Sequence, residues 1–258
     1  MITRKSPAEI EKMRRAGRIV AEVLALMESE LAPGVSTGHL DRLAERHIRA
    51  AGATPSFKGY LGGGKYGKGP HAFPASTCIS IDSEVVHGIP GERTVRAGSI
   101  VSVDTGAILD GWHGDGARTF IVGDVPAEVR DLVDTTRLAI MAGIAAAQPG
   151  ARVDDISAAI EDIGRAHGYG IVRPFVGHGI GTRMHEDPQV PNYRDGRRGP
   201  ELQPGMCLAI EPMFTLGSGD VYVDEDGWTV VTADDRLAAH FEHTIAITAD
   251  GPQILTKA

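Results

Sequence analysis

Apolar residues near the start of the chain recur at helical spacing. Ser6 to Glu9 has the form of a capping box with proline at the first helical position, and apolar residues follow three or four positions apart from Ile10 to Met27. Pro33-Gly34 ends this predicted helix. Thr37 begins a second one with apolar residues on one face, and Gly52 follows its end.

The pattern then changes to short apolar runs bounded by turn residues, which predicts strands. Two of these runs flank a Gly-rich segment and predict a hairpin. Helical spacing returns after Pro126, stops at Pro149-Gly150, and resumes after a cap at Asp154 or Asp155 until Gly168. The predicted strands cover residues 76–81, 100–109, 118–122, 206–214, 228–232 and 241–248.

The order of predicted elements repeats once along the chain. Pro33 and Pro149 are separated by the same number of residues as Gly52 and Gly168, although the two halves share little sequence. We therefore expect two αα-β halves, roughly 1–122 and 123–258, that pack into a single α+β domain over 1–258. A cleft shared by the halves is the natural place for chemistry.

Composition and charge narrow the class of protein. The 258 residues are 42% hydrophobic and 23% charged, which excludes a disordered chain, and the net charge of −8 disfavours nucleic-acid binding. Cys78 and Cys207 are too few for a disulfide framework. The N-terminus has no apolar signal-peptide core, and no uncharged run reaches the ~20 residues of a membrane span. We expect a cytoplasmic protein without a membrane partner.

Two familiar motif types are absent and a third is only approached. The sequence contains no HExxH and no GxSxG. Residues 59–66 and 62–69 nearly match a phosphate-binding loop, but both lack the final Ser or Thr that would bind magnesium. We interpret this Gly- and Lys-rich segment as a surface loop.

Four acidic residues lie in apolar, strand-like surroundings: Asp104, Asp115, Glu211 and Glu242. Buried salt bridges or a hairpin turn would explain some of them, but acids are rarely buried without a partner or a metal. His178 lies in Gly-His-Gly-Ile-Gly, whose glycines offer no side chains for an apolar core around the imidazole. One imidazole and four carboxylates suit manganese, iron(II) or cobalt, and zinc less well. They are enough for two bridged ions, so the residues point to a two-metal hydrolase.

At these residues the sequence resembles the short type I methionine aminopeptidases, across nearly the whole chain. The matching motifs include Pro33-Gly-Val-Ser-Thr, Val85-Val-His-Gly-Ile-Pro, Gly177-His-Gly-Ile-Gly, His185-Glu-Asp-Pro-Gln-Val and Phe241-Glu-His-Thr. The resemblance implies the pita-bread fold, in which helices cover a central curved antiparallel sheet. It also implies removal of the initiator methionine from nascent polypeptides, with a preference for a small second residue.

The resemblance implies roles for individual residues. Asp115 and Glu242 would bridge two divalent ions, His178 and Glu211 would complete one metal site, and Asp104 would complete the other. Glu211 would also exchange protons with the attacking water. His87 would hydrogen-bond near the scissile amide, and His185 would donate to the substrate carbonyl as it becomes an oxyanion.

The resemblance also implies a narrow apolar slot for methionine, with walls from Tyr60, Phe73, Cys78, Met184 and Trp228. Taken alone, each of these residues is as well explained by core packing, and Trp228 beside Gly227 has the form of a hairpin turn. His113 and His243 neighbour the ligands but match no direct role. Many glycines cluster near the site, and we expect them to form tight turns around the ligands.

The segment from Leu61 to His71 is longer than in typical family members, and it is either a tolerated surface insertion or a lid. Two rival functions remain. One is a proline-cleaving peptidase of the same fold, whose members usually carry an extra N-terminal domain. The other is a metal-free binding protein on this scaffold. We expect a monomer that docks at most transiently at a ribosome.

Overall fold

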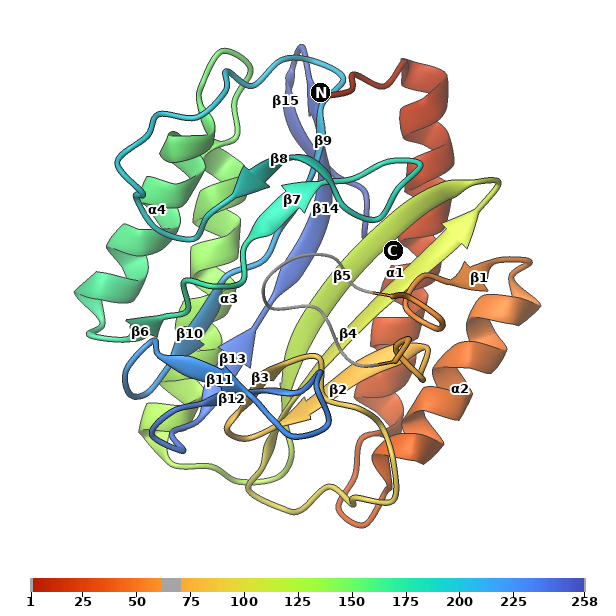
Figure 1. Cartoon of the computed structure of the whole chain (residues 1–258), viewed down its shortest axis with the longest axis vertical. Coiled ribbons are helices and arrows are strands. Elements are labelled where there is room, and N and C mark those ends of the chain that lie inside the picture. The colour runs from red at the N-terminus through yellow and green to blue at the C-terminus, as the bar shows by residue number, and fades with distance from the viewer. Residues whose placement is uncertain (1, 62–70, 258) are drawn as a thin grey trace.

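The computed structural model describes residues 2–61 and 71–257. The segment predicted as a surface insertion or a lid lies, apart from Leu61 and His71, outside the described residues. The described chain folds into four helices and three antiparallel sheets (Figure 1). The helices are α1 (Pro7–Glu30), α2 (Thr37–Ala50), α3 (Ala127–Ala146) and α4 (Val153–Ala166).

The largest sheet has nine strands in the described residues, and its main path runs β1-β4-β5-β14-β9-β7-β8. β2 pairs with β4, and β15 pairs with β14, outside this path. The strands of this sheet are β1 (Thr54–Pro55), β2 (Thr77–Ile81), β4 (Ile100–Leu109), β5 (Trp112–Ile121), β7 (Gly177–Gly179), β8 (Glu186–Val190), β9 (Cys207–Ile210), β14 (Glu242–Thr248) and β15 (Gly251–Ile254).

Two small three-stranded sheets accompany the large one. One has the order β13-β10-β6 and the other β11-β12-β3. Their strands are β3 (Glu84–Val86), β6 (Gly170–Ile171), β10 (Met213–Thr215), β11 (Val221–Val223), β12 (Val230–Thr232) and β13 (Ala238–His240).

The four predicted helices are confirmed, and the start of α1 follows its capping signal. The Ser6 hydroxyl accepts from the Glu9 backbone N–H, and the Glu9 carboxylate accepts from the Ser6 backbone N–H. The predicted cap of α4 was wrong by two to three residues. Arg152 occupies the N-cap, and Asp155 instead accepts from the Arg152 N–H at 2.7 Å.

The predicted strands need three corrections. The predicted hairpin forms between β4 and β5, but its turn is confined to Asp110 and Gly111, because β5 begins at Trp112 and runs through Asp115. The predicted strand 206–214 is interrupted after Ile210, and β10 resumes at Met213. Several short strands, including β7 and β8, carry too little apolar alternation to be predicted.

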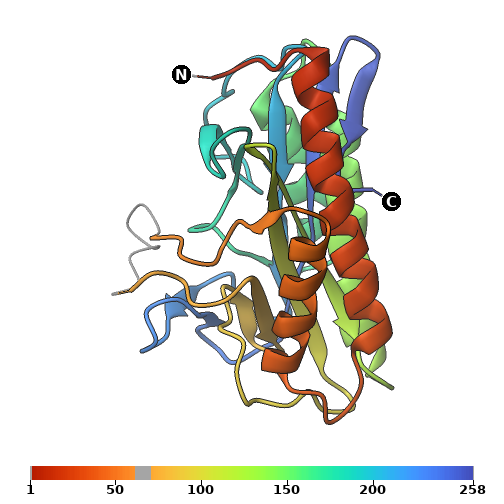
Figure 2. The same ribbon diagram turned by 90° about the vertical axis from the view of Figure 1, so that its right-hand side faces the viewer.

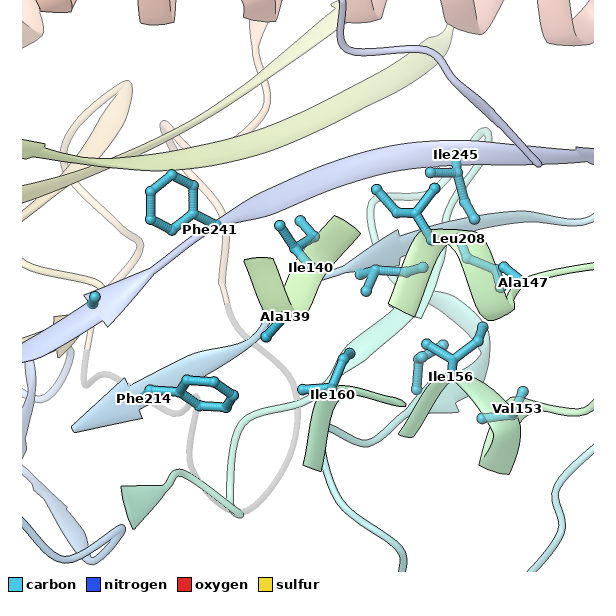
Figure 3. Close-up of a cluster of buried hydrophobic side chains, with 14 of the residues drawn as sticks. Ala139, Ile140, Ala147, Val153, Ile156, Ile160, Leu208, Phe214, Phe241 and Ile245 are labelled. Atoms are coloured by element: carbon cyan, nitrogen blue, oxygen red, sulfur yellow. The ribbon is translucent and has the colours of Figure 1, made fainter. Parts of the chain in front are cut away.

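Helices cover one side of the large sheet. Val101 and Val103 of β4 pack with apolar residues of α1 and α2, while Leu208 of β9 and Ile245 of β14 pack with residues of α3 and α4. Figure 3 shows the second of these cores, with Ile140, Ile156 and Ile160 of the helices beside strand residues. In Figure 2, α1 lies on one side of the sheet, and the orange and blue loop segments lie on the other.

Among residues 2–61 and 71–257, none of the helices combines the length and apolar character that a membrane span requires. The helices bury one face of the large sheet. The candidate site residues lie on its opposite face, which the helices do not cover.

Candidate metal centre

Strand register places three of the four predicted acids on one face of the sheet. Asp104 of β4 lies directly opposite Ala117 of β5, and Ala117 lies opposite Glu242 of β14. Asp115 is two residues from Ala117 along β5, and side chains two apart on a strand share a face. Val101 and Val103 face the helices, so alternation turns Asp104 to the opposite side.

The same reasoning brings in the remaining ligands. His178 of β7 lies opposite Ala209 of β9, and Ala209 lies opposite Thr244, two residues beyond Glu242. Glu211 follows Ala209 by two residues, just past the end of β9. Five residues that are far apart in sequence therefore converge from five strands or strand ends.

Distances confirm that the side chains meet. One ligand atom each from Asp115, His178 and Glu242 lies within 4.8 Å of the other two, and all three residues are buried. Glu211 Oε1 lies 3.6 Å from His178 Nε2. The His178 ring is oriented by its other nitrogen, because Nδ1 lies 2.9 Å from the Gly179 carbonyl oxygen. That contact requires a proton on Nδ1 and leaves Nε2 with its lone pair toward the carboxylates.

The donor set fits divalent cations. Asp104 Oδ1, Asp115 Oδ1 and Glu242 Oε1 are buried and have no hydrogen-bond partner. Buried carboxylate oxygens are normally paired, because an unpaired one loses its hydration without compensation. No Lys or Arg in the described residues forms an ion pair with any of the four acids. A metal ion is the partner that this chemistry calls for.

The four carboxyl groups of the site have raised pKa values, so they keep their protons to a higher pH than exposed carboxyl groups do. Burial raises the pKa of Asp104 to about 8. Burial, together with the neighbouring acids, raises the pKa of Asp115, Glu211 and Glu242 well above the usual range. Burial lowers the pKa of His178 to about 3, so its imidazole is neutral and able to ligate.

Glycines around the site mainly permit close backbone packing, which corrects the expected tight turns. A Cβ on Gly177 would lie 2.4 Å from the Ala209 carbonyl oxygen, and one on Gly179 would lie 2.1 Å from that of Asp187. Gly114 lies within β5 and faces the backbone of α1. Gly111 does form a turn, with a φ of +80°. Most of these glycines are therefore required by neighbouring strands and a helix, not by a ligand.

All twelve predicted site residues line one cavity of about 830 Å³. Besides the five candidate ligands, it is lined by His87, His185 and the five predicted slot residues. The slot residues Phe73, Cys78, Met184 and Trp228 belong to one buried apolar cluster, and Tyr60 packs against it. The core-packing and pocket interpretations of these residues therefore both hold, because the cluster is also a wall.

Trp228 is fixed by the turn that carries it. The Asp226 carboxylate accepts from the backbone N–H groups of Trp228 and Thr229, each at 2.8 Å. The indole N–H donates to the His71 carbonyl at 3.1 Å, and the ring meets Phe73 edge-on at 5.2 Å. The hairpin-turn interpretation is thus correct, and the turn aims the indole at the cavity.

His87 has an unusual backbone conformation, with a φ of +62°. This left-handed region is costly for a non-glycine residue and tends to occur at functional sites. Its ring meets Phe175 at 5.5 Å and Trp228 at 6.3 Å, and its buried Nδ1 has no partner. Burial lowers the pKa of His87 to about 4, so the ring is neutral at pH 7.

His185 connects the cluster to the slot. Its ring centroid lies 4.2 Å from that of His178, and its Nδ1 lies 2.8 Å from the Tyr60 hydroxyl. Burial lowers the pKa of His185. His113 and His243 do not line the cavity: each has a hydroxyl partner, Ser56 at 3.0 Å and Thr256 at 2.8 Å.

The cavity also contains residues that the sequence did not single out. Phe57, Phe175 and Met213 contribute apolar wall, and Glu186 lies beside His185. Phe175 could have been found from its place three residues before His178. Phe57 and Met213 read as ordinary core residues and gave no signal.

Comparison with known proteins defines the class of this fold and site. The model of metallopeptidase family M24 matches residues 11–249. A methionine aminopeptidase of Clostridium perfringens is 48% identical over 256 residues, with 99% of each chain covered. Methionine aminopeptidase 1 of Bacillus subtilis is 47% identical over the full length of both chains. The chain belongs to the M24 metallopeptidases, among the short type I methionine aminopeptidases.

Solved structures agree with this placement. The methionine aminopeptidase of Thermotoga maritima superposes with a TM-score of 0.94, at 42% identity and with all of both chains covered. The expected pita-bread fold is thereby confirmed. The prolidase of Pyrococcus furiosus shares the fold with a TM-score of 0.78 at 23% identity, and this chain spans 65% of its length.

Proposed function

We propose that this protein is a dinuclear-metal aminopeptidase that removes the initiator methionine from nascent proteins and peptides. The observation that carries the proposal is the cluster of one neutral imidazole and four carboxylates, with unpaired buried oxygens, at the end of an apolar slot. Family membership supports the same activity.

The five candidate ligands divide naturally between two ions. We assign Asp115 and Glu242 as bridging residues, Asp104 to one ion, and His178 with Glu211 to the other. Manganese, iron(II) and cobalt suit this oxygen-rich set best, and zinc suits it less well. Such ions, when bound, polarise the scissile carbonyl and lower the pKa of a water.

The protein's own residues supply the remaining steps of peptide hydrolysis. We assign Glu211 as the base that takes a proton from the attacking water and as the acid that passes this proton to the amine nitrogen as the carbonyl–nitrogen bond breaks, so that the leaving group departs as a neutral amine. His185 donates to the developing oxyanion through the ring nitrogen that does not contact Tyr60. We assign His87, which also lines the cavity, to hydrogen-bond near the scissile amide.

We infer that the slot selects methionine by shape. Phe73, Cys78, Met184 and Trp228 form an apolar wall in which an unbranched, polarisable side chain is well accommodated. A preference for a small second residue fits the crowding where His185 contacts both Tyr60 and His178. A free amino terminus would supply an amine ligand for the bound ions, which an internal peptide bond lacks, so we expect no cleavage of internal bonds.

The remaining parts of the proposal concern the whole protein. We propose one peptidase domain over residues 1–258 with its internal repeat, a monomeric state, and a cytoplasmic location. Its partners are then the amino termini of nascent chains, reached by at most transient docking at the ribosome, without binding nucleic acid or membrane.

Mass spectrometry of two tripeptides tests the proposal. The metal-loaded protein should release methionine from Met-Ala-Ser and nothing from Ala-Pro-Ala. Cleavage of the proline peptide alone would favour the proline-cleaving alternative. Thorough chelation should abolish the release, and added manganese, cobalt or iron should restore it. A protein that never binds divalent metal would support the binding-protein alternative.

A further inference from the structure

Lys5 is a buried lysine close to the active-site cavity, and its partner is Glu186. Its Nζ lies 2.8 Å from Glu186 Oε2, and the two side chains are 4% and 3% exposed. Lysine and glutamate are rarely buried this completely unless they are paired. This ion pair joins the segment before α1 to the start of β8, although 181 residues separate the two.

The Glu186 carboxylate also holds the turn that precedes it. Oε2 accepts from the Thr3 hydroxyl at 2.6 Å in addition to Lys5. Oε1 accepts from the backbone N–H of Arg183 at 3.3 Å, and the Gly181 N–H donates to the Arg183 carbonyl. One carboxylate therefore fixes the turn from Gly181 to Glu186 against the N-terminal segment.

The N-terminal segment itself is anchored, so it can serve as a fixed support. The Lys5 N–H donates to the Gly205 carbonyl at 2.7 Å, and Arg4 Nε donates to the Pro204 carbonyl at 2.8 Å. Lys5 directly precedes the Ser6 cap of α1. The backbone of Lys5 is thereby held between the start of α1 and the segment that precedes β9.

Gly181 leaves the space that the ion pair occupies. A Cβ at this position would lie 2.6 Å from Glu186 Oε1 and 2.7 Å from Lys5 Cε. The Gly181 carbonyl in turn accepts from the His113 N–H at 2.9 Å, which ties the turn to β5. The ion pair therefore packs closely against the turn instead of only touching its end.

This turn displays Met184 and His185, two residues that line the cavity. We propose that Lys5 and Glu186 are positioning residues that hold His185 at the substrate carbonyl and Met184 in the slot wall. The proposal rests on the proposed function, because it gives His185 its role there. Among the described residues before α1, neither Lys5 nor any other lines the cavity.

The expected effect of a loosened turn is a loss of rate more than of binding. A displacement of about 1 Å in a catalytic group can lower the rate about 100-fold. Glu186→Gln keeps the shape of the side chain but removes the charge, which weakens both hydrogen bonds from the N-terminal segment. The metal ligands lie on other elements and should keep their metal.

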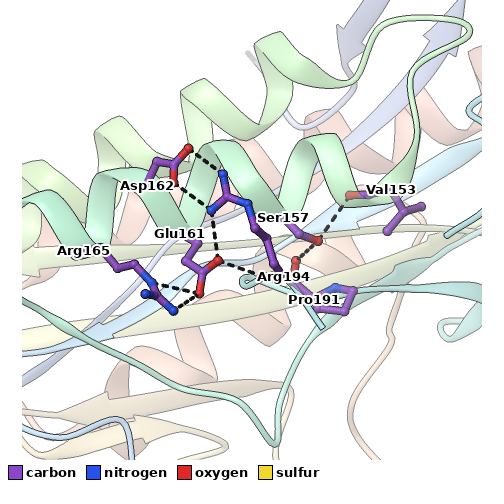
Figure 4. Close-up of polar contacts among 7 residues, drawn as sticks. All are labelled: Val153, Ser157, Glu161, Asp162, Arg165, Pro191 and Arg194. Carbon is purple, nitrogen blue, oxygen red and sulfur yellow. Dashed lines mark hydrogen bonds and ion pairs between the residues drawn. The ribbon is translucent and has the colours of Figure 1, made fainter. Parts of the chain in front are cut away.

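Glu161 offers a matched control, because it is an equally buried carboxylate away from the cavity. Its side chain is 3% exposed and binds Arg165 at 2.7 Å and Arg194 at 3.1 Å (Figure 4). None of these three residues lines the active-site cavity. Glu161→Gln therefore removes a comparable buried charge without touching the turn that carries His185.

The experiment compares Lys5→Met, Glu186→Gln, Lys5→Arg and Glu161→Gln with the wild type, using Met-Ala-Ser hydrolysis, metal content and backbone hydrogen exchange. We expect Lys5→Met and Glu186→Gln to lower kcat by about 10- to 100-fold, with KM changed less than threefold and metal content unchanged. Exchange over residues 181–187 should quicken in both. Lys5→Arg should recover part of the rate, and Glu161→Gln should leave kcat and this exchange unchanged.

Two results would overturn the proposal. The first is a kcat of wild-type size in Glu186→Gln, and the second is an equal loss in Glu161→Gln. If a single variant does not fold, the double variant Lys5→Met/Glu186→Gln replaces both charges and is measured in the same way. The exchange measurement needs no activity. A wild-type protein that fails to release methionine therefore refutes the proposed function, and altered exchange in the variants still tests the support of the turn.

Discussion

His185 lies close to the candidate metal ligands, and we propose a different task for it. Its ring lies 4.2 Å from that of the candidate ligand His178, while its Nδ1 is engaged by the Tyr60 hydroxyl. The group of ligand atoms that converge includes Asp115, His178 and Glu242 but not His185. We therefore separate its contribution to the rate from any contribution to metal binding.

Replacement of His185 by alanine should lower kcat about 10²- to 10³-fold, the usual effect of removing one oxyanion donor. Metal content, measured by elemental mass spectrometry, should stay at the wild-type level. His39→Ala on α2 is the matched control, because His39 does not line the cavity, and it should change neither quantity. A parallel loss of metal and rate in His185→Ala would instead identify His185 as a ligand.

At this scale the sequence predicted the cavity well, and the reason is chemical. Four of the candidate ligands are acids in apolar surroundings and the fifth is a histidine among glycines, so each stands out locally. The slot residues were reached through the resemblance. Lys5 and Glu186 could not be predicted as a pair, since each is an ordinary charged residue in its own segment. Only the folded chain brings them together and buries them.

Among the elements, β5 and α1 pack closely at a position where the sequence predicted a turn. Gly114 was expected in a turn, but it lies within β5 with its Cα against the helix. A Cβ there would lie 2.6 Å from the Gly17 backbone nitrogen of α1. Asp115, the next residue along β5, faces the opposite side, so this contact sets the depth of a candidate metal ligand.

Gly114→Ala should destabilise the protein by about 1–3 kcal/mol, the usual effect of overpacking, because neither backbone can yield without moving the other. Chemical denaturation measures this change. Gly91→Ala is the control, since a Cβ there meets nothing within 4 Å and its φ is not positive, and it should stay near the wild-type value. Equal stability of the two variants would show that α1 moves freely against β5.

The helices were predicted more accurately than the strands, for a physical reason. A helix satisfies its hydrogen bonds locally, and its caps and apolar spacing lie within one stretch of sequence. β7 has only three residues, Gly-His-Gly, whose strand conformation comes from pairing with β8 and β9. Such pairing is a property of the whole sheet, which no local pattern encodes.

For the whole molecule, some of the acidic residues behind the net charge of −8 lie inside the protein and not on its surface. Four of the acids lie together in one cavity, where burial raises all four pKa values and repulsion from neighbouring acids raises those of Asp115, Glu211 and Glu242 further. The four acids come from four strands or strand ends: β4, β5, the end of β9, and β14. The stability of the protein and its affinity for metal are therefore linked through the same protons.

The linkage gives a prediction for the dependence of stability on pH. In the metal-free protein the pKa of Asp104 is raised from 3.8 to about 8, so between these values the folded state binds more protons than the unfolded state. The contribution of Asp104 protonation to the free energy of unfolding is fully present below about pH 4 and is lost as the pH rises through about 8. Above pH 6.5 histidine titration in the unfolded state no longer opposes this trend. The Tm in EDTA should therefore fall from pH 7 to pH 9.

Added Mn²⁺ should counteract the fall of Tm with rising pH. Metal ligands bind as deprotonated groups, and binding to the folded state stabilises that state. The rise in Tm on adding Mn²⁺ should thus be larger at pH 8.5 than at pH 6.5. Asp104→Asn should flatten both curves, since it removes the carboxyl group whose raised pKa of about 8 lies within this pH interval. Glu161→Gln, at a carboxylate whose pKa is lowered by its two arginines despite burial, should leave the slopes between pH 7 and pH 9 unchanged. If the Tm in EDTA rises from pH 7 to pH 9, the pKa values of these acids are not raised in the folded protein.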